Sequence, residues 1–166
     1  MSGLLAACAG GSNQPKQLVA GGLDEFFFKE TERLRQNNPQ VLKTIQHNQK
    51  KESKTLQIKD WGQELSIFAT IGLDNPKIRD KYKIDTLPNS IRFQALTKDV
   101  PVQAADIQME AGQIRQLNVA LHTQNLISDT QQFLTYEPQK GYIIVQTQKI
   151  WGGETTETRI ETRWGG

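Results

Sequence analysis

Cysteine, histidine and long apolar segments are scarce in this chain of 166 residues, and each scarcity excludes a class of protein. Cys8 is the only cysteine, so no disulfide forms within the chain. No apolar segment approaches the roughly 20 residues of a membrane-spanning helix. The 20 basic and 18 acidic residues leave a net charge of +2 without a basic stripe, so binding to nucleic acid has no electrostatic support.

The composition that remains favours a single domain rich in strands. A domain of roughly 150 residues buries about 68–70% of its unfolded surface, so it needs neither a disulfide nor a metal to fold. Only 36% of the residues are hydrophobic, and the polar remainder is rich in Gln and Thr. These residues suit the exposed faces of antiparallel strands.

The single cysteine follows a short apolar segment, Leu5-Ala6-Ala7, and precedes a polar one. This arrangement resembles the lipobox of bacterial lipoproteins, in which the cysteine is lipidated. Residues 1–8 contain no basic residue and too few apolar ones for a working secretory signal, so we expect them to be a truncated remnant. We expect residues 9–22 to be a flexible tether and residues 23–166 to be one domain. The alternative is an incidental cysteine in a disordered tail.

Three helical segments are expected in the first half of the domain. Leu23, Phe27, Glu30 and Leu34 share one face of a helix that ends at Asn37-Asn38-Pro39. Asp60 and Gln63 form a potential capping box for a second helix, whose apolar face comprises Trp61, Leu65, Phe68 and Gly72. Pro76 stands at the first position of a short third helix that ends near Tyr82.

The remaining segments alternate as strands do. Residues 41–47 and 52–58 flank a short polar loop and predict a β-hairpin. Six further segments, joined by short turns, predict an antiparallel meander of about six strands. They are residues 90–97, 100–109, 113–122, 131–136, 142–151 and 155–164. The expected fold is therefore α+β: an N-terminal helix, a β-hairpin, a helical segment and then the meander, with the helices packed on one face.

Several segments together resemble an uncharacterised family of cell-envelope lipoproteins from Bacteroidetes. They are residues 60–68 (DWGQELSIF), 74–76 (DNP), 81–82 (KY) and 134–144 (LTYEPQKGYII), and the similarity spans residues 23–150. The family has no activity to carry over. The resemblance implies a lipid anchor in a Gram-negative envelope, at the outer membrane. This chain departs from the family at its start, where the usual full-length signal is missing.

Few residues carry a recognisable chemistry. His47 and His122 lack further ligands at metal-binding spacing, so we expect no metal site and no cofactor. No nucleophile elbow or phosphate-binding loop appears, and we expect no catalytic residues. Cys8 is the lipidation candidate. Binding candidates are Phe28, which follows two other phenylalanines on the first helix, and Trp151 and Trp164, at the ends of the last two strands. The alternative for each is packing in the core.

Three functions compete at this point. The first is a lipid-anchored envelope protein that binds a partner protein or a lipophilic ligand, with no nucleic acid as partner. A large apolar cleft without clustered titratable groups would favour it. The second is an envelope hydrolase with an unrecognised carboxylate pair, which two close carboxylates in a cleft would favour. The third is a structural subunit of a larger complex, which an exposed apolar patch or an open edge strand would favour.

Overall fold

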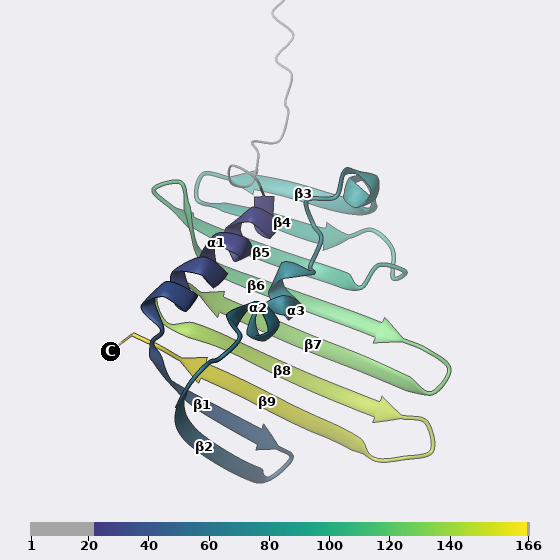
Figure 1. The fold of residues 1–166 in the computed structure, drawn as a ribbon. Coiled ribbons are helices and arrows are strands. Elements are labelled where there is room, and N and C mark those ends of the chain that lie inside the picture. Colours follow the sequence, from purple (N-terminus) through teal and green to yellow (C-terminus); the bar gives the residue numbers. More distant parts are fainter. Residues whose placement is uncertain (1–21, 166) are drawn as a thin grey trace, which may run out of the picture.

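The computed structural model describes residues 22–165, so Cys8 and residues 9–21 of the expected tether lie outside the described part. This part forms one sheet and four helical segments (Figure 1). The helices are α1 (Gly22–Asn37), α2 (Trp61–Glu64), α3 (Ser66–Ala69) and the 3-10 helix η1 (Pro76–Lys81). The strands are β1 (Gln40–His47), β2 (Lys50–Gln57), β3 (Tyr82–Leu87), β4 (Ser90–Ala95), β5 (Val102–Glu110), β6 (Gln113–Gln124), β7 (Ser128–Glu137), β8 (Gly141–Ile150) and β9 (Thr155–Arg163).

The nine strands form a single antiparallel sheet in the order β2-β1-β9-β8-β7-β6-β5-β4-β3. Strands β3 to β9 follow one another as a meander, and the β1–β2 hairpin adds beside the last strand. Helices α1, α2 and α3 lie over one face of this sheet (Figure 1). We call this the covered face, and the opposite one the open face.

The expected α+β class is wrong, because the sheet is larger than the sequence pattern predicted and the second expected helix is broken into two short ones. Strands contain 54% of the described residues and helices 21%, so the protein is predominantly β. The six expected meander strands correspond to β4 to β9, but the β1–β2 hairpin and β3 extend the same sheet. The single helix expected after Asp60 is divided at Leu65 into the one-turn helices α2 and α3. Glycine and β-branched residues in this segment lower its helix propensity.

Helix α1 forms where the apolar periodicity predicts it. Its buried residues include Leu23, Phe27, Glu30 and Leu34, so the predicted face is confirmed. The carboxylate of Asp74 accepts a hydrogen bond from the Leu23 amide. This bond satisfies one of the free amides of the first turn and ties the helix to the loop before η1.

The predicted helix signals of Asp60 and Pro76 are also confirmed. The Asp60 carboxylate accepts from the Gln63 amide at 3.0 Å, as an N-cap does. Pro76 stands at the start of η1, where the Asn75 side chain accepts from the Lys77 amide. These caps fix where α2 and η1 begin.

The core lies between the helices and the covered face. Phe27 of α1 stacks on Phe68 of α3, and both contact the ring of Tyr136 in β7. Trp61 is buried, as predicted, and packs edge-on against Trp164 with ring centroids 5.5 Å apart. Aromatic pairs at such distances add to the stabilisation from buried area.

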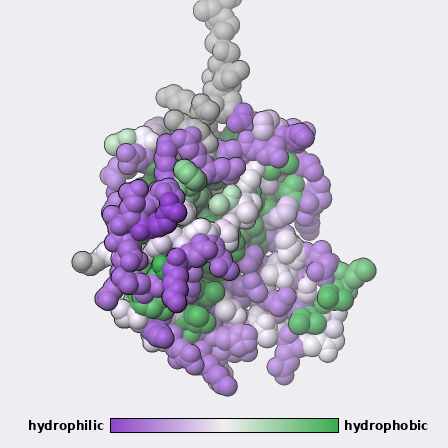
Figure 2. All heavy atoms as spheres, in the orientation of Figure 1, coloured by the Kyte–Doolittle hydropathy of each residue, from purple (hydrophilic) through white to green (hydrophobic). Residues whose placement is uncertain are grey.

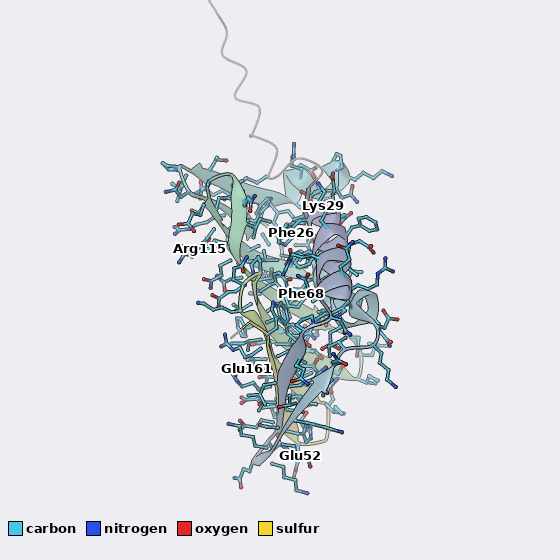
Figure 3. All side chains as sticks on the ribbon, turned by 60° about the vertical axis from the view of Figure 1, so that its left-hand side comes forward. Phe26, Lys29, Glu52, Phe68, Arg115 and Glu161 are labelled. Carbon is cyan, nitrogen blue, oxygen red and sulfur yellow. The ribbon has the colours of Figure 1, made fainter. Side chains whose placement is uncertain are left out.

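The open face is mostly polar, with Phe133 as an exposed apolar side chain, which explains why the sheet needs no second layer. Glu161 of β9 accepts hydrogen bonds from Arg163 at 2.7 Å and from Arg159 at 3.1 Å. Arg92 of β4 pairs with Asp106 of β5 at 3.1 Å. Figure 3 shows Phe68 between the sheet and the helices, whereas Glu161 lies away from them. Water can therefore solvate this face.

Candidate functional site

Two tyrosines lie side by side at the turn between β7 and β8. Tyr136 and Tyr142 are direct register partners across this hairpin, and both point to the covered face. The hairpin begins β8 at Gly141, whose φ is +138°. A Cβ atom at this position would lie 1.9 Å from the carbonyl oxygen of Thr162 in β9. Glycine therefore allows β8 and β9 to approach closely beside the tyrosine pair.

Each tyrosine donates its hydroxyl to a glutamate from a helix. Tyr136 Oη lies 2.6 Å from Oε2 of Glu30 in α1. Tyr142 donates in the same way to Oε1 of Glu64 in α2. Two of the helices on the covered face, α1 and α2, are thus joined to one hairpin by charged hydrogen bonds, which are stronger than neutral ones.

Each glutamate also has a cationic partner. Arg33 of α1 donates to both oxygens of Glu30, at 2.9 Å and 2.8 Å. Lys43 of β1 lies 2.7 Å from Glu64. Glu30 is only 8% exposed, and a carboxylate so deeply buried requires such compensation. The network is closed by the carbonyl of Pro138, which accepts from Arg33 and from the Trp164 indole.

The surroundings keep both tyrosines protonated. Burial, and then the charge of Glu30, raise the pKa of Tyr136 well above its ordinary value. Burial and the hydrogen bond to Glu64 raise the pKa of Tyr142 in the same direction. The hydrogen bond to Glu30 raises the pKa of Arg33. The tyrosines are therefore hydrogen-bond donors and do not act as bases near neutral pH.

The Glu30–Arg33 pair borders a cleft of about 530 Å³ at this end of the sheet. The cleft lies between α1 and the turns that join β5 to β6 and β7 to β8. Phe26 and Ile114 supply its apolar walls. Figure 3 shows Phe26 on the side of α1 toward Arg115, which lies across the cleft in β6. The volume is in the range of small-molecule sites.

The charges that line this cleft are balanced pairwise. Its three glutamates each bind a cation of the same cleft, and none forms a free carboxylate pair with another. The pairs are Glu30–Arg33 at 2.8 Å, Glu110–Arg115 at 2.6 Å and Glu137–Lys140 at 2.7 Å. A general acid of a hydrolase requires a carboxyl group that stays protonated, which burial without a cation favours. This cleft has the opposite arrangement.

A second depression, of about 510 Å³, lies on the open face around the ring of Phe133. Residues of β3 to β7 line it, and they include the Arg92–Asp106 pair. This depression does not border the hydrogen-bond network of the buried Glu30, as the cleft beside α1 does. The cleft beside α1 is therefore the stronger candidate for a binding site.

The three predicted binding residues differ in their exposure to solvent. Phe28 is 66% exposed on the outer side of α1, and neither it nor the two tryptophans line the cleft. Trp164 is 6% exposed, so it belongs to the core and offers a partner almost no surface. Trp151 is 48% exposed in the turn between β8 and β9. Cys8, the predicted lipidation site, lies outside the described residues.

The histidines lie apart from the cleft. His47 contacts the hydroxyl of Thr158 at 2.9 Å. His122 lies 3.1 Å from both carboxylate oxygens of Asp129, a neighbour that its sequence context did not indicate. Within residues 22–165, no three His, Cys, Asp or Glu side chains are arranged to hold a metal ion.

The residues of the cleft and its network were missed at the level of sequence. One signal was present: Glu30 is a charged residue on the apolar face of a predicted helix, and such a residue needs a buried partner. The partner could not be identified, because Tyr136 lies more than one hundred positions further along the chain.

Comparison with known proteins assigns no family. No protein-family model matches the chain, and neither the curated proteins nor the solved structures include a match. Among the described residues, no helix has the length and apolar character to cross a membrane. The function must therefore be argued from the cleft and from the sequence.

Proposed function

We propose that this chain is a lipid-anchored protein of the bacterial cell envelope, at the outer membrane, that binds a lipophilic ligand without catalysis. The observation that carries the binding role is the cleft beside α1, with apolar walls at Phe26 and Ile114 and paired charges around them. The anchor rests on Cys8 and its sequence context. The resemblance to envelope lipoproteins of Bacteroidetes stays a prediction that agrees with both.

The chemistry of the cleft favours an amphiphile. An acyl or aromatic group would remove water from Phe26 and Ile114, at roughly 25 cal/mol for each Å² of apolar surface. A polar end would meet Arg115 and Lys140, which are exposed and can exchange their glutamate partners for a ligand. Glu30 and Arg33 have a structural role in the wall of the cleft. Their charges already have partners, because Arg33 and Tyr136 both donate hydrogen bonds to Glu30.

The hydrolase alternative finds no support in this geometry. Each glutamate of the cleft has a cation within 2.8 Å, and Tyr136 stays a donor because its pKa is raised. The structural alternative would need an exposed apolar patch, and the exposed turn that contains Trp151 lies outside the cleft. The cleft therefore carries the binding role.

Filling the cleft tests the binding role. Gln113→Trp places a large side chain at an exposed position of the cleft wall, and Gln131→Trp makes the same change on an exposed strand position elsewhere. Each protein is extracted from its own host's envelope with a mild detergent, and bound lipophiles are measured by mass spectrometry. We expect a bound lipophile in the wild type and in Gln131→Trp, and loss of most of it in Gln113→Trp. Equal amounts in the two variants would contradict the proposal.

The anchor is tested by labelling. The protein is expressed in its host with a complete signal and a radioactive or alkyne-tagged fatty acid. We expect the label on the wild type, in the outer-membrane fraction, and no label on Cys8→Ser. The serine variant should leave the membranes when they are washed. A serine variant that resists washing as the wild type does would refute the anchor, independently of the result for the cleft.

A further inference from the structure

Exposed apolar side chains gather on two neighbouring turns at one end of the sheet. Leu126 and Ile127, in the turn between β6 and β7, are 97% and 70% exposed. Ile150 and Trp151, where β8 turns toward β9, are each about half exposed. The two turns lie side by side and project beyond the other turns of this end (Figure 1). Figure 2 shows the apolar protrusion at the right-hand edge of the molecule. We call these four residues the apolar tip.

Hydrogen bonds hold the apolar tip together as one unit. The Trp151 amide donates to the Ile127 carbonyl at 3.0 Å, which joins the two turns. The Asn125 side chain accepts from the amides of Ile127 and Ser128 at 2.9 Å and 2.8 Å. Because these backbone groups already have partners within the protein, they lose little when water is removed. Such internal pairing is what a lipid environment requires of a backbone.

The apolar tip is also free of charge at its centre. Residues 124–128 and 150–153 contain no ionisable side chain. Lys149 lies over the ring of Trp151, 5.4 Å from its centroid, at the border of the tip. The charged residues that flank these segments are Asp129, Lys149 and Glu154. Tryptophan with a bordering lysine is typical of the boundary between lipid and water.

We propose that the apolar tip inserts into the interfacial region of a lipid bilayer. Four side chains on two projecting turns form a narrow point, rather than the broad complementary surface of roughly 800 Å² that a stable protein interface uses on each partner. A bilayer adapts to such a point, and Leu126 and Ile127 gain from leaving water. The flanking charges have mixed signs, so the insertion depends on apolar contact more than on anionic lipid. Neither the cleft nor Cys8 takes part in this insertion.

Vesicle binding by the unlipidated chain tests this proposal. The full chain with Cys8→Ser is mixed with sucrose-loaded vesicles of phosphatidylcholine, with or without phosphatidylglycerol, and sedimented. We expect weak, reversible binding to both compositions that resists added salt. The fluorescence of Trp151 should shift to the blue and be quenched by brominated lipid. Leu126→Asp should lower the vesicle partition coefficient at least about tenfold. The variant loses the gain from removing the leucine side chain from water, and its new carboxylate would have to leave water as the tip inserts.

A matched control distinguishes binding through the tip from nonspecific adsorption to vesicles. Leu87→Asp makes the same change at an exposed leucine, the last residue of β3, outside the tip. We expect Leu87→Asp to bind vesicles like its parent. Because Leu126 is almost fully exposed, Leu126→Asp should also keep the parent's melting temperature. Absence of binding by the parent, binding only to anionic vesicles that salt abolishes, or equal binding by the two aspartate variants would overturn the proposal.

A photo-reactive amino acid at position 126 tests the occupant in native envelopes. Irradiation should give adducts with lipid. Adducts with one protein in place of lipid would show that the tip is a protein-docking site and would overturn the proposal. Because the vesicle experiment uses Cys8→Ser, its outcome is independent of the lipid anchor and of the ligand in the cleft.

Discussion

At the scale of single residues, two charged hydrogen bonds decide how the helices are held on the sheet. Glu30 of α1 and Glu64 of α2 each accept from a tyrosine of the β7–β8 hairpin. A carboxylate that lost one donor would keep its burial and lose part of its compensation. These bonds therefore position α1 and the wall of the cleft as well as stabilising the fold.

The bond from Tyr136 to Glu30 is tested with Tyr136→Phe. The change removes a hydroxyl donor to a buried carboxylate, and hydrogen bonds to charged groups contribute about 1.5–3 kcal/mol. The control is Tyr82→Phe, which removes a donor to the neutral carbonyl of Val102 and should cost about 1 kcal/mol. Urea unfolding gives both free energies of unfolding. A smaller loss for Tyr136→Phe than for Tyr82→Phe would show that Arg33 alone compensates Glu30.

Sequence reasoning at this scale succeeded where a residue's role is local. The burial of Trp61, the N-cap at Asp60 and the helix start at Pro76 follow from spacing within one or two turns of helix, and the structure confirms them. The partners of Glu30 and Glu64 depend on contacts between distant segments, which periodicity cannot show. The alternatives for Trp164 and Trp151 could not be separated for the same reason, since both stand at strand ends.

At the scale of elements, the β7–β8 hairpin organises the site. It presents both tyrosines and contributes one wall of the cleft through Pro138 and Lys140. Its second strand, β8, pairs with β9 from Gly141 to Lys149. Its close approach to β9 depends on Gly141. Strand assignments for β4 to β9 followed from alternation, whereas the position of β1 beside β9 did not, because no local pattern encodes a pairing between the two ends of the domain.

The requirement for glycine in this hairpin is tested with Gly141→Ala. The new Cβ would lie 1.9 Å from the Thr162 carbonyl, so β8 and β9 would have to separate. Gly112→Ala is the control, because Gly112 also has a positive φ, whereas a Cβ atom there would have open space for 4 Å around it. We expect Gly112→Ala to lower the free energy of unfolding by about 1–2 kcal/mol, because alanine disfavours a positive φ. Gly141→Ala should lower it clearly more. Equal losses by thermal unfolding would mean that the strands adjust without cost.

Glu161 of β9 should make the free energy of unfolding depend on pH. The hydrogen bonds from Arg163 and then Arg159 lower the pKa of Glu161 below its ordinary 4.5. A carboxyl whose pKa is lower in the folded state stabilises the protein above the unfolded pKa, and this contribution is lost as pH falls through the folded pKa. Glu161→Gln should therefore cost up to about 1 kcal/mol at neutral pH, since the pair is partly exposed.

The measurement compares the two proteins at several pH values. Urea unfolding is measured at pH 7, 5, 4 and 3. The difference in free energy of unfolding between the wild type and Glu161→Gln should be constant at the higher pH values and shrink below about pH 4.5. Other carboxylates titrate in the same range, but they are common to both proteins and cancel in the difference. A difference that grew on acidification would contradict the assigned direction of the pKa of Glu161.

At the scale of the whole molecule, the sheet leaves two strands without an outer neighbour. These are β2 and β3, at opposite ends of the strand order. All but one of the eight residues of β2 are exposed, and lysines occupy positions 50, 51 and 54. β3 has Lys83 and Asp85 among its exposed residues. Charged edge strands resist pairing with another sheet. The open edges that would have favoured a structural subunit are thus chemically protected.

The last prediction concerns this protection. Lys51→Val with Lys54→Val replaces the charges on both faces of β2 by β-branched side chains, which favour strand pairing. In the Cys8→Ser background, the double variant should show self-association that increases with concentration, measured by light scattering after size-exclusion chromatography. Lys77→Val with Lys98→Val removes the same charge from exposed positions outside the strands and should behave as its parent. If both double variants associated equally, net charge rather than the edge of β2 would control solubility, and the lysines of this strand would have no special role.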